Sequence, residues 1–239
     1  MSTRIERNGQ LMRNREVIEE ILTKAHICVY TLAMKQNARR SSIRKRKPSQ
    51  ERAKVTVDAM LDAVVRLLKR GGSSSITTNR IAETAGVSVG SVYQYFPNKN
   101  ALFVALHERH IGLVAEVIRR RMTECSGSSL EHLVESLVEG MVEVHTVDPE
   151  LSELLGSEVP HRADGTVDFS IRFHEAFRIA LAPHTASFGT KIDLDTRAFV
   201  MANMVDALGH AVVLRRPRGL SLARAKAESC KAILAYLAS

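Results

Sequence analysis

Two short helical patterns that meet at a glycine constrain the fold of this chain more than any other feature. Residues 78 to 85 and 88 to 96 have apolar groups at helical spacing, and Gly86 lies between them. A glycine can take the tight turn between two helices that cross closely. The stretch therefore predicts a helix-turn-helix, with Ser88 as the N-terminal cap of the second helix. The side chains expected to pack the pair together are Ile81, Ala82, Ala85, Val87 and Val92.

The second helix of this pair has two distinct faces when its residues are counted at roughly 100° each. If Val92 points inward, Phe96, Val89 and Ser88 lie on or near the inner side. The outer face then offers a backbone without a side chain, hydroxyl groups and an amide, which suit base edges and phosphates in a major groove. For the two tyrosines the alternative is packing between helices with wetted hydroxyls. The outer face is Gly90, Ser91, Tyr93 and Gln94, with Tyr95 at its border.

Helical patterns cover most of the remaining chain, and we find no alternating β pattern and no internal repeat. One pattern covers residues 14 to 37, and a basic stretch ending at Pro48 follows it. Ser49 is the expected cap of the next helix, which Gly71 and Gly72 end. These patterns predict an all-α protein with eight to ten helices. Later breaks fall at Gly127, Asp148-Pro149, 160–165, 183–193 and 217–219.

Positive charge is concentrated in the first half of the chain. The net charge is +8, with +11 in residues 1–110 and −3 in residues 111–239. This asymmetry indicates contact with a polyanion at one end only, although a solvated basic surface has the same composition.

The segment TTNRIAETAGVSVGSVYQYFPNKNALF closely resembles the DNA-binding signature of the TetR family of transcriptional repressors. The resemblance is strong over residues 50 to 105 and weaker in DPELSELL and the last helices. It implies a three-helix helix-turn-helix domain followed by a larger helical domain for ligand binding and dimerisation. The expected divisions are an N-terminal extension (1–48), the DNA-binding domain (49–98) and the ligand and dimer domain (99–239).

The resemblance also implies roles for individual residues. Thr77 and Thr78 open the first helix of the pair, where free N–H groups and hydroxyls hold a phosphate. Asn79 reaches a base or a phosphate, and Lys99 contacts the DNA backbone. The full set of expected DNA contacts is Thr77, Thr78, Asn79, Ser88, Val89, Gly90, Ser91, Tyr93, Gln94, Tyr95 and Lys99.

In the second half, the resemblance places a small-molecule pocket among the helices, although each of its residues also suits a plain core. The expected lining residues are Met141, His145, Phe173, His174 and Phe177. The patterns at 193 to 215 and 221 to 238, with Ser221 as a cap, contain small residues suited to a dimer bundle. Among these small residues are Ala202 and Gly209.

Residues 1–47 extend beyond the usual start of the family. Either an extra amphipathic helix precedes the basic arm, or the start codon is assigned too early. In both cases we expect the arm to contact phosphates or the minor groove. Its basic residues are Arg39, Arg40, Arg44, Lys45, Arg46 and Lys47.

Other kinds of site have little support in the sequence. Cys28, Cys125 and Cys230 are widely spaced, which suits free thiols in a reducing cytoplasm. HERH at 107 to 110 is half of a zinc site without a matching second pair. No phosphate-binding loop or hydrolase motif occurs, so we expect no catalysis, metal or cofactor. No apolar run approaches the ~18 residues that span a membrane.

The sequence therefore predicts a cytoplasmic, homodimeric transcriptional regulator that binds a palindromic operator and is released by a small molecule, with repression favoured over activation. The sequence does not identify the effector, and it leaves activation open as the alternative. Two other classes compete with this interpretation: a DNA-organising protein without an effector, and a helical enzyme.

Overall fold

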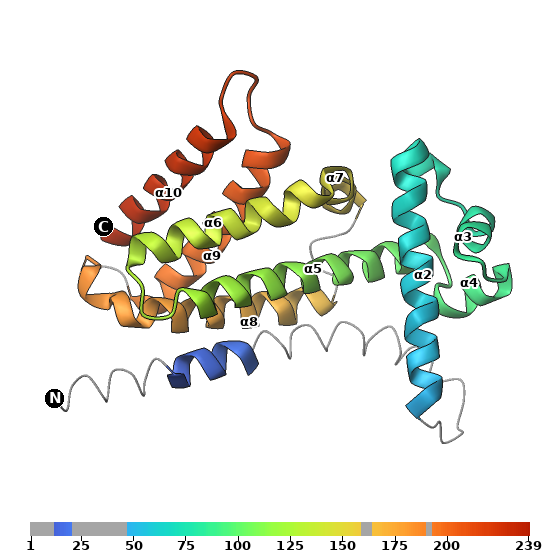
Figure 1. Ribbon diagram of the computed structural model, residues 1–239, viewed down its shortest axis with the longest axis horizontal. Coiled ribbons are helices and arrows are strands. Elements are labelled where there is room, and N and C mark those ends of the chain that lie inside the picture. Colours follow the sequence, from blue (N-terminus) through green and yellow to red (C-terminus); the bar gives the residue numbers. More distant parts are fainter. Residues whose placement is uncertain (1–11, 21–46, 159–163, 190–192) are drawn as a thin grey trace. The chain divides into compact units, whose positions relative to one another are not determined.

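The computed structural model describes residues 12–20, 47–158, 164–189 and 193–239, and these residues contain α-helices, short 3-10 helices and loops but no strand (Figure 1). The prediction of an all-α protein is therefore confirmed. After a helix at residues 12–20, the α-helices are α2 (Lys47–Gly71), α3 (Thr78–Ala85), α4 (Val89–Tyr95), α5 (Lys99–Glu124), α6 (Leu130–Val147), α7 (Pro149–Glu158), α8 (Asp164–Leu181), α9 (Leu194–Leu214) and α10 (Leu222–Ala238), with 3-10 helices at Ser73–Ser75 and Ala182–Ser187.

Contacts group the chain into two compact units. The first, which we call the head, comprises residues 28–110 and 150–165. Its core joins α2, α3, α4, the first turns of α5, and α7, which contributes Leu151, Leu154 and Leu155. The head thus includes residues on both sides of the expected division after residue 98, and that division into functional domains stays a prediction.

The start of α2 differs from the prediction. The helix begins at Lys47 rather than after a cap at Ser49, and Pro48 lies in its first turn. A proline is tolerated there because its missing N–H would have no partner within the helix. The helix ends at Gly71, as the sequence predicts, and Gly72 has a φ of 64°.

The second unit, which we call the body, comprises residues 1–27, 111–149 and 166–239. Its core is built mainly where α6 packs against α9 and α10. A Cβ on Gly209 would lie 2.5 Å from the Cβ of Met141, so α9 approaches α6 closely there. Ala202 is likewise buried, at 1% exposure. These two small residues therefore pack α9 within one chain, and the prediction that they face a second chain is wrong.

Within the described residues, α9 is the one helix long and apolar enough to span a membrane, in contrast to the expectation that no segment comes close. It packs against α6 and α10. Its Arg197 is fully buried and donates hydrogen bonds to the carbonyls of Tyr236, Leu237 and Gly189. A guanidinium satisfies several carbonyls at once, which compensates part of the cost of burying its charge. Arg197 thereby links α9 to the end of α10.

The helix at residues 12–20 packs on the body. Ile18 is buried in the body core, at 4% exposure. A carboxylate oxygen of Glu19 lies 3.7 Å from a guanidinium nitrogen of Arg119 in α5. The sequence predicts a longer helix over 14–37 followed by the basic arm. Residues 21–46, which hold the rest of that helix and all of the arm except Lys47, lie outside the described part of the chain.

Candidate nucleic-acid interface

The two helices α3 and α4 are fixed by local hydrogen bonds at their ends. The Thr77 hydroxyl accepts the Arg80 N–H at 3.3 Å and caps α3. Gly86 then takes a left-handed conformation, with φ 69° and ψ 33°, which a glycine adopts without steric cost. The Ser88 hydroxyl accepts the Ser91 N–H at 3.0 Å and caps α4. The predicted helix-turn-helix and the predicted cap at Ser88 are therefore confirmed.

The inner face of α4 is sealed against the head core. Val92 and Phe96 are 0% and 3% exposed, and both belong to the same cluster as Ile81 and Ala82 of α3. Val89 was expected near the inner side but is 37% exposed, and Ser88 is also exposed. Ser88 is the N-cap of α4, and Val89 is its first residue. The inner face is therefore shorter than helical counting alone indicates.

The outer face of α4 is exposed and carries no charged side chain. Gly90, Tyr93 and Gln94 are all exposed, and Tyr93 has 54% of its surface accessible. The Tyr93 hydroxyl lies 3.4 Å from that of Thr78, so the two helices present adjacent hydroxyls. Tyr95 is half-buried against the head core, at the predicted border. The arrangement offers hydroxyl and amide groups on one continuous surface.

Gly90 has no structural requirement for glycine. A Cβ there would meet only the Ser88 hydroxyl oxygen, at 3.7 Å, which is ordinary van der Waals contact. A glycine inside a helix costs about 0.5–1 kcal/mol relative to alanine. The space above Gly90 is therefore available to a molecule that approaches the α4 backbone closely.

The remaining predicted contacts surround this surface. Asn79 is exposed in the first turn of α3. Lys99, at the start of α5, is exposed and donates a hydrogen bond to the Ser73 carbonyl at 3.3 Å. Its amine also lies 5.2 Å from the centre of the Phe103 ring. Lys99 is thus held near the loop before α3, where its charge is available to a phosphate.

Two residues of this region were missing from the predicted set. Asn98 accepts the Ala101 N–H at 2.8 Å and caps α5, which fixes the position of Lys99. An asparagine directly before a helical pattern is a recognised cap signal, so the sequence contained this information. Arg80 is exposed beside Asn79 and supplies a further positive charge next to the α3 N-terminus.

The residues expected to line an effector pocket are packed in the body core. Met141 and Phe177 are fully buried, and the rings of Phe173 and Phe177 lie 4.9 Å apart. The buried ring of His145 meets His210 edge to face at 5.0 Å. His174 is half-buried, and burial lowers its pKa.

A crevice of about 330 Å³, including its open mouth, lies elsewhere in the body. It is formed by the helix at 12–20 with the ends of α5 and α8 and the start of α6. None of the five expected effector residues lines it. Its lining includes Asn14, Ile18, Met122, Cys125, Leu133 and His184.

Two family profiles match separate parts of the chain. The profile described as "Bacterial regulatory proteins, tetR family" matches residues 60–106, and "Tetracyclin repressor-like, C-terminal domain" matches residues 129–237. The HTH-type transcriptional regulator AcrR of Shigella flexneri is 32% identical over 119 residues, which are 50% of this chain and 54% of AcrR. The chain thus spans about half the length of this relative.

Two further comparisons concern a shorter sequence match and the fold. The nucleoid occlusion factor SlmA of Actinobacillus pleuropneumoniae is 43% identical over 51 residues, which cover 21% of this chain and 25% of SlmA. The fatty acid degradation regulator FadR from Bacillus halodurans superimposes with a TM-score of 0.60 at 20% identity. That superposition covers 80% of this chain and 97% of FadR, and it shows that the two proteins share a fold.

Proposed function

The chain belongs to the TetR family of bacterial regulatory proteins, and we propose that it is a cytoplasmic, homodimeric transcriptional regulator. Its heads bind a palindromic DNA operator, and a small molecule bound in the body releases them. Repression is the mode of action that this release mechanism favours.

One observation carries the proposal: α4 is sealed on its inner face and exposed on an outer face that has no charged side chain. Gln94 on that face can pair with an adenine through two hydrogen bonds, and Gly90 permits close approach. Around it, Lys99 and the hydroxyls of Thr78 and Tyr93 are placed for phosphate oxygens. Sequence-specific DNA binding requires both base contacts, which select the sequence, and phosphate contacts, which position the protein. This surface offers the first at its centre and the second around it.

The effector is proposed to bind among Met141, His145, Phe173, His174 and Phe177 in the body. Because these side chains are buried or half-buried, a ligand must displace some of them or favour a conformation in which they separate. Such a ligand shifts the equilibrium between the two conformations only to the extent that it binds one of them more tightly than the other.

A DNA-organising protein without an effector is the second candidate, and the match to SlmA, a nucleoid occlusion factor, favours it. That match covers only 25% of SlmA and 21% of this chain, so most of each protein lies outside it. A ligand that binds the body and lowers operator affinity would separate the two functions in favour of a one-component regulator.

Selection of genomic fragments by the full-length chain, followed by binding measurements at several salt concentrations, tests DNA recognition. Gln94→Ala should cost about 1–3 kcal/mol on the selected fragment and little on unrelated DNA. Lys99→Ala serves as the comparison, because removal of a phosphate-binding group weakens all duplexes alike. Failure of the chain to prefer any fragment over bulk DNA would overturn the proposal.

A further inference from the structure

The helix at residues 12–20 is held on the body mainly by one side chain. Ile18 is the single buried residue among its nine. A helix of this length is marginal in water unless tertiary contacts support it. The ion pair between Glu19 and Arg119 adds little, because both side chains are partly exposed. The attachment of the helix therefore depends on the site that Ile18 occupies.

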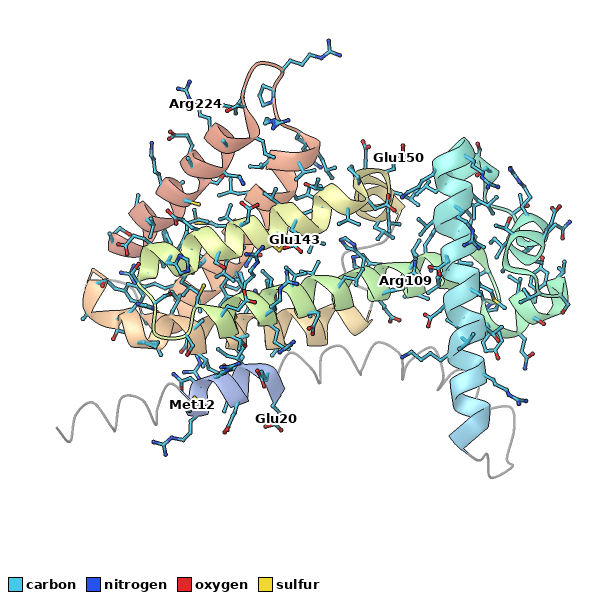
Figure 2. The ribbon with its side chains drawn as sticks, in the orientation of Figure 1. Met12, Glu20, Arg109, Glu143, Glu150 and Arg224 are labelled. Carbon is cyan, nitrogen blue, oxygen red and sulfur yellow. The ribbon has the colours of Figure 1, made fainter. Side chains whose placement is uncertain are left out.

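Ile18 occupies an apolar part of the crevice in the body. The crevice is also lined by Met122 at the end of α5, Leu133 of α6 and Ile179 of α8. Met122 and Leu133 are each 2% exposed, and Ile179 packs against the same core. Figure 2 shows the short helix, with Met12 labelled at its start, alongside these parts of the body. Ile18 is thus an aliphatic group inserted among apolar side chains of three other helices.

A cation lies beside this apolar site. Arg119 precedes Met122 by three residues in α5, so the two side chains are neighbours on the helix surface. The Nε and Nη2 atoms of Arg119 donate hydrogen bonds to Glu116 at 3.0 and 2.5 Å. Its Nη1 atom lies 3.7 Å from Glu19, which is beyond hydrogen-bond distance, and Glu19 is also 3.6 Å from Arg15 of its own helix. A carboxylate that is not attached to this helix can approach Nη1 more closely than Glu19 does.

This combination is a feature of the present chain. The two family profiles match residues 60–106 and 129–237, so the helix at 12–20, Arg119 and Met122 all lie outside them. None of the five residues proposed to bind the effector lines the crevice. The crevice is therefore separate from the proposed effector site.

From these observations we infer that the crevice binds a small aliphatic carboxylate, which takes the places of Ile18 and Glu19. The aliphatic chain lies among Met122, Leu133 and Ile179, and the carboxylate accepts a hydrogen bond from Arg119. The carboxylate stays at the partly exposed edge, so its charge is not buried without a partner. Because the crevice measures about 330 Å³ with its open mouth, at the lower end of the range for ligand pockets, the chain must be short.

The ligand and the helix at residues 12–20 exclude one another, because both need the same apolar space. Binding of the carboxylate therefore releases the helix from the body. A released helix of nine residues loses its backbone hydrogen bonds, since it is too short to persist alone. This inference does not depend on DNA binding.

The test uses the full-length chain with hexanoate at about pH 7, where a carboxylic acid is ionised. Hexanamide keeps the chain without the charge, and acetate keeps the charge without the chain. In calorimetric titrations both should bind at least about tenfold more weakly than hexanoate, because each lacks one of the two contacts. Hexanoate should also accelerate amide hydrogen exchange in the peptide that contains residues 12–20, and acetate should not.

Two matched pairs of variants locate the site. Ile18→Ala empties the apolar space and should increase the affinity for hexanoate several-fold, whereas Val17→Ala, at an exposed position, should not change it. Arg119→Gln should lower the affinity for hexanoate about tenfold and leave that for hexanamide unchanged. Arg120→Gln is the control, because Arg120 is the neighbouring arginine and has its own partner, Glu143. It should alter neither affinity.

Three results would each overturn the inference. They are equal affinities for hexanoate in Ile18→Ala and Val17→Ala, equal losses in Arg119→Gln and Arg120→Gln, and slower exchange of residues 12–20 when hexanoate is bound. If Ile18→Ala does not fold, the arginine pair decides alone. No DNA is present in these measurements, so their failure leaves the proposed function intact. A chain that prefers no DNA fragment contradicts only the proposed function.

Discussion

At the scale of single residues, Gly90 separates the requirements of folding from those of DNA binding. Because a Cβ at this position meets only the Ser88 hydroxyl oxygen at 3.7 Å, we expect Gly90→Ala to fold normally. Its free energy of unfolding should rise by up to about 1 kcal/mol, since alanine is the better helix former. Operator affinity should nevertheless fall, because the added methyl occupies space that the DNA approaches. Urea unfolding and operator binding measure the two effects, and unchanged affinity would show that DNA does not approach this backbone.

The buried carboxyl of Glu108 should make the stability of the protein depend on pH. It is 8% exposed in α5, and burial raises the pKa of its carboxyl from 4.5 to about 7. Between these values the folded state keeps a proton that the unfolded state has lost, so stability falls as the pH rises through this range. Above pH 7 the Glu108 carboxyl is ionised in the folded state as well, and burial of this charge lowers the free energy of unfolding by about 3 kcal/mol.

Glu108→Gln removes this ionisation and should therefore stabilise the protein by about 3 kcal/mol at pH 8 and hardly at all at about pH 4.5. Urea unfolding at the two pH values measures the difference. Glu83→Gln, an exposed change in α3 of the same head, serves as the control and should alter stability by about 0.5 kcal/mol or less. A Glu108→Gln effect of equal size at both pH values would mean that altered packing, rather than ionisation, is responsible.

At the scale of elements, the helix at residues 12–20 supplies a matched pair of variants. Ile18 is 4% exposed in the body core, whereas its neighbour Val17 is 42% exposed. Ile18→Glu should detach this helix, because a carboxylate cannot be buried there without a partner. Detachment would uncover the crevice and its buried Cys125. The Cys125 thiol should then react faster with a thiol reagent, as followed by mass spectrometry of the labelled peptide.

Val17→Glu should leave the reactivity of Cys125 unchanged. A difference between the two variants is expected because Ile18 is part of the body core, whereas Val17 is exposed. Equal reactivity in the two variants would show that the helix at residues 12–20 does not protect Cys125.

Elements whose signals are local were predictable from the sequence. Gly86 and the cap Ser88 act on residues within four positions of themselves, so the turn and the start of α4 follow from spacing alone. The partner of a helix face is not encoded in this way. Gly209 and Ala202 are small residues on α9, and only the fold reveals that α6 of the same chain approaches this helix. For the same reason, neither the packing of Ile18 on the body nor the exposure of Val89 follows from helical periodicity.

At the scale of the whole molecule, regulation requires that ligand binding and DNA binding be coupled. One helix-turn-helix reads only a few base pairs, so an operator of two half-sites needs two heads at a set spacing. The helix α5 begins in the head and ends in the body, and it is therefore the direct covalent route between the two sites. A ligand that prefers the non-binding spacing by a few kcal/mol is sufficient to release the DNA.

The final prediction concerns the dimer surface. Because Ala202 and Gly209 are buried within one chain, this surface must use other residues of α9. Phe199, Asn203 and Ala207 are exposed on one face of α9, at spacings of four residues, and Ala227 is exposed on α10. Small exposed residues beside an exposed aromatic ring suit close packing of these helices against a second chain. Ala207→Arg should therefore yield monomers with a folded body, because an exposed position accepts a long side chain without disturbing the core of its own chain.

Gly209→Arg is the matched comparison two residues away. It should destabilise the body instead, because any side chain there collides with Met141. Sedimentation measures association, and circular dichroism during thermal unfolding distinguishes a stable monomer from an unfolded chain. The Ala207→Arg monomer should retain weak binding to bulk DNA through its single head, yet lose the operator, because two half-sites are no longer bound together. Tight and selective operator binding by a demonstrated monomer would show that head spacing is not what the ligand controls.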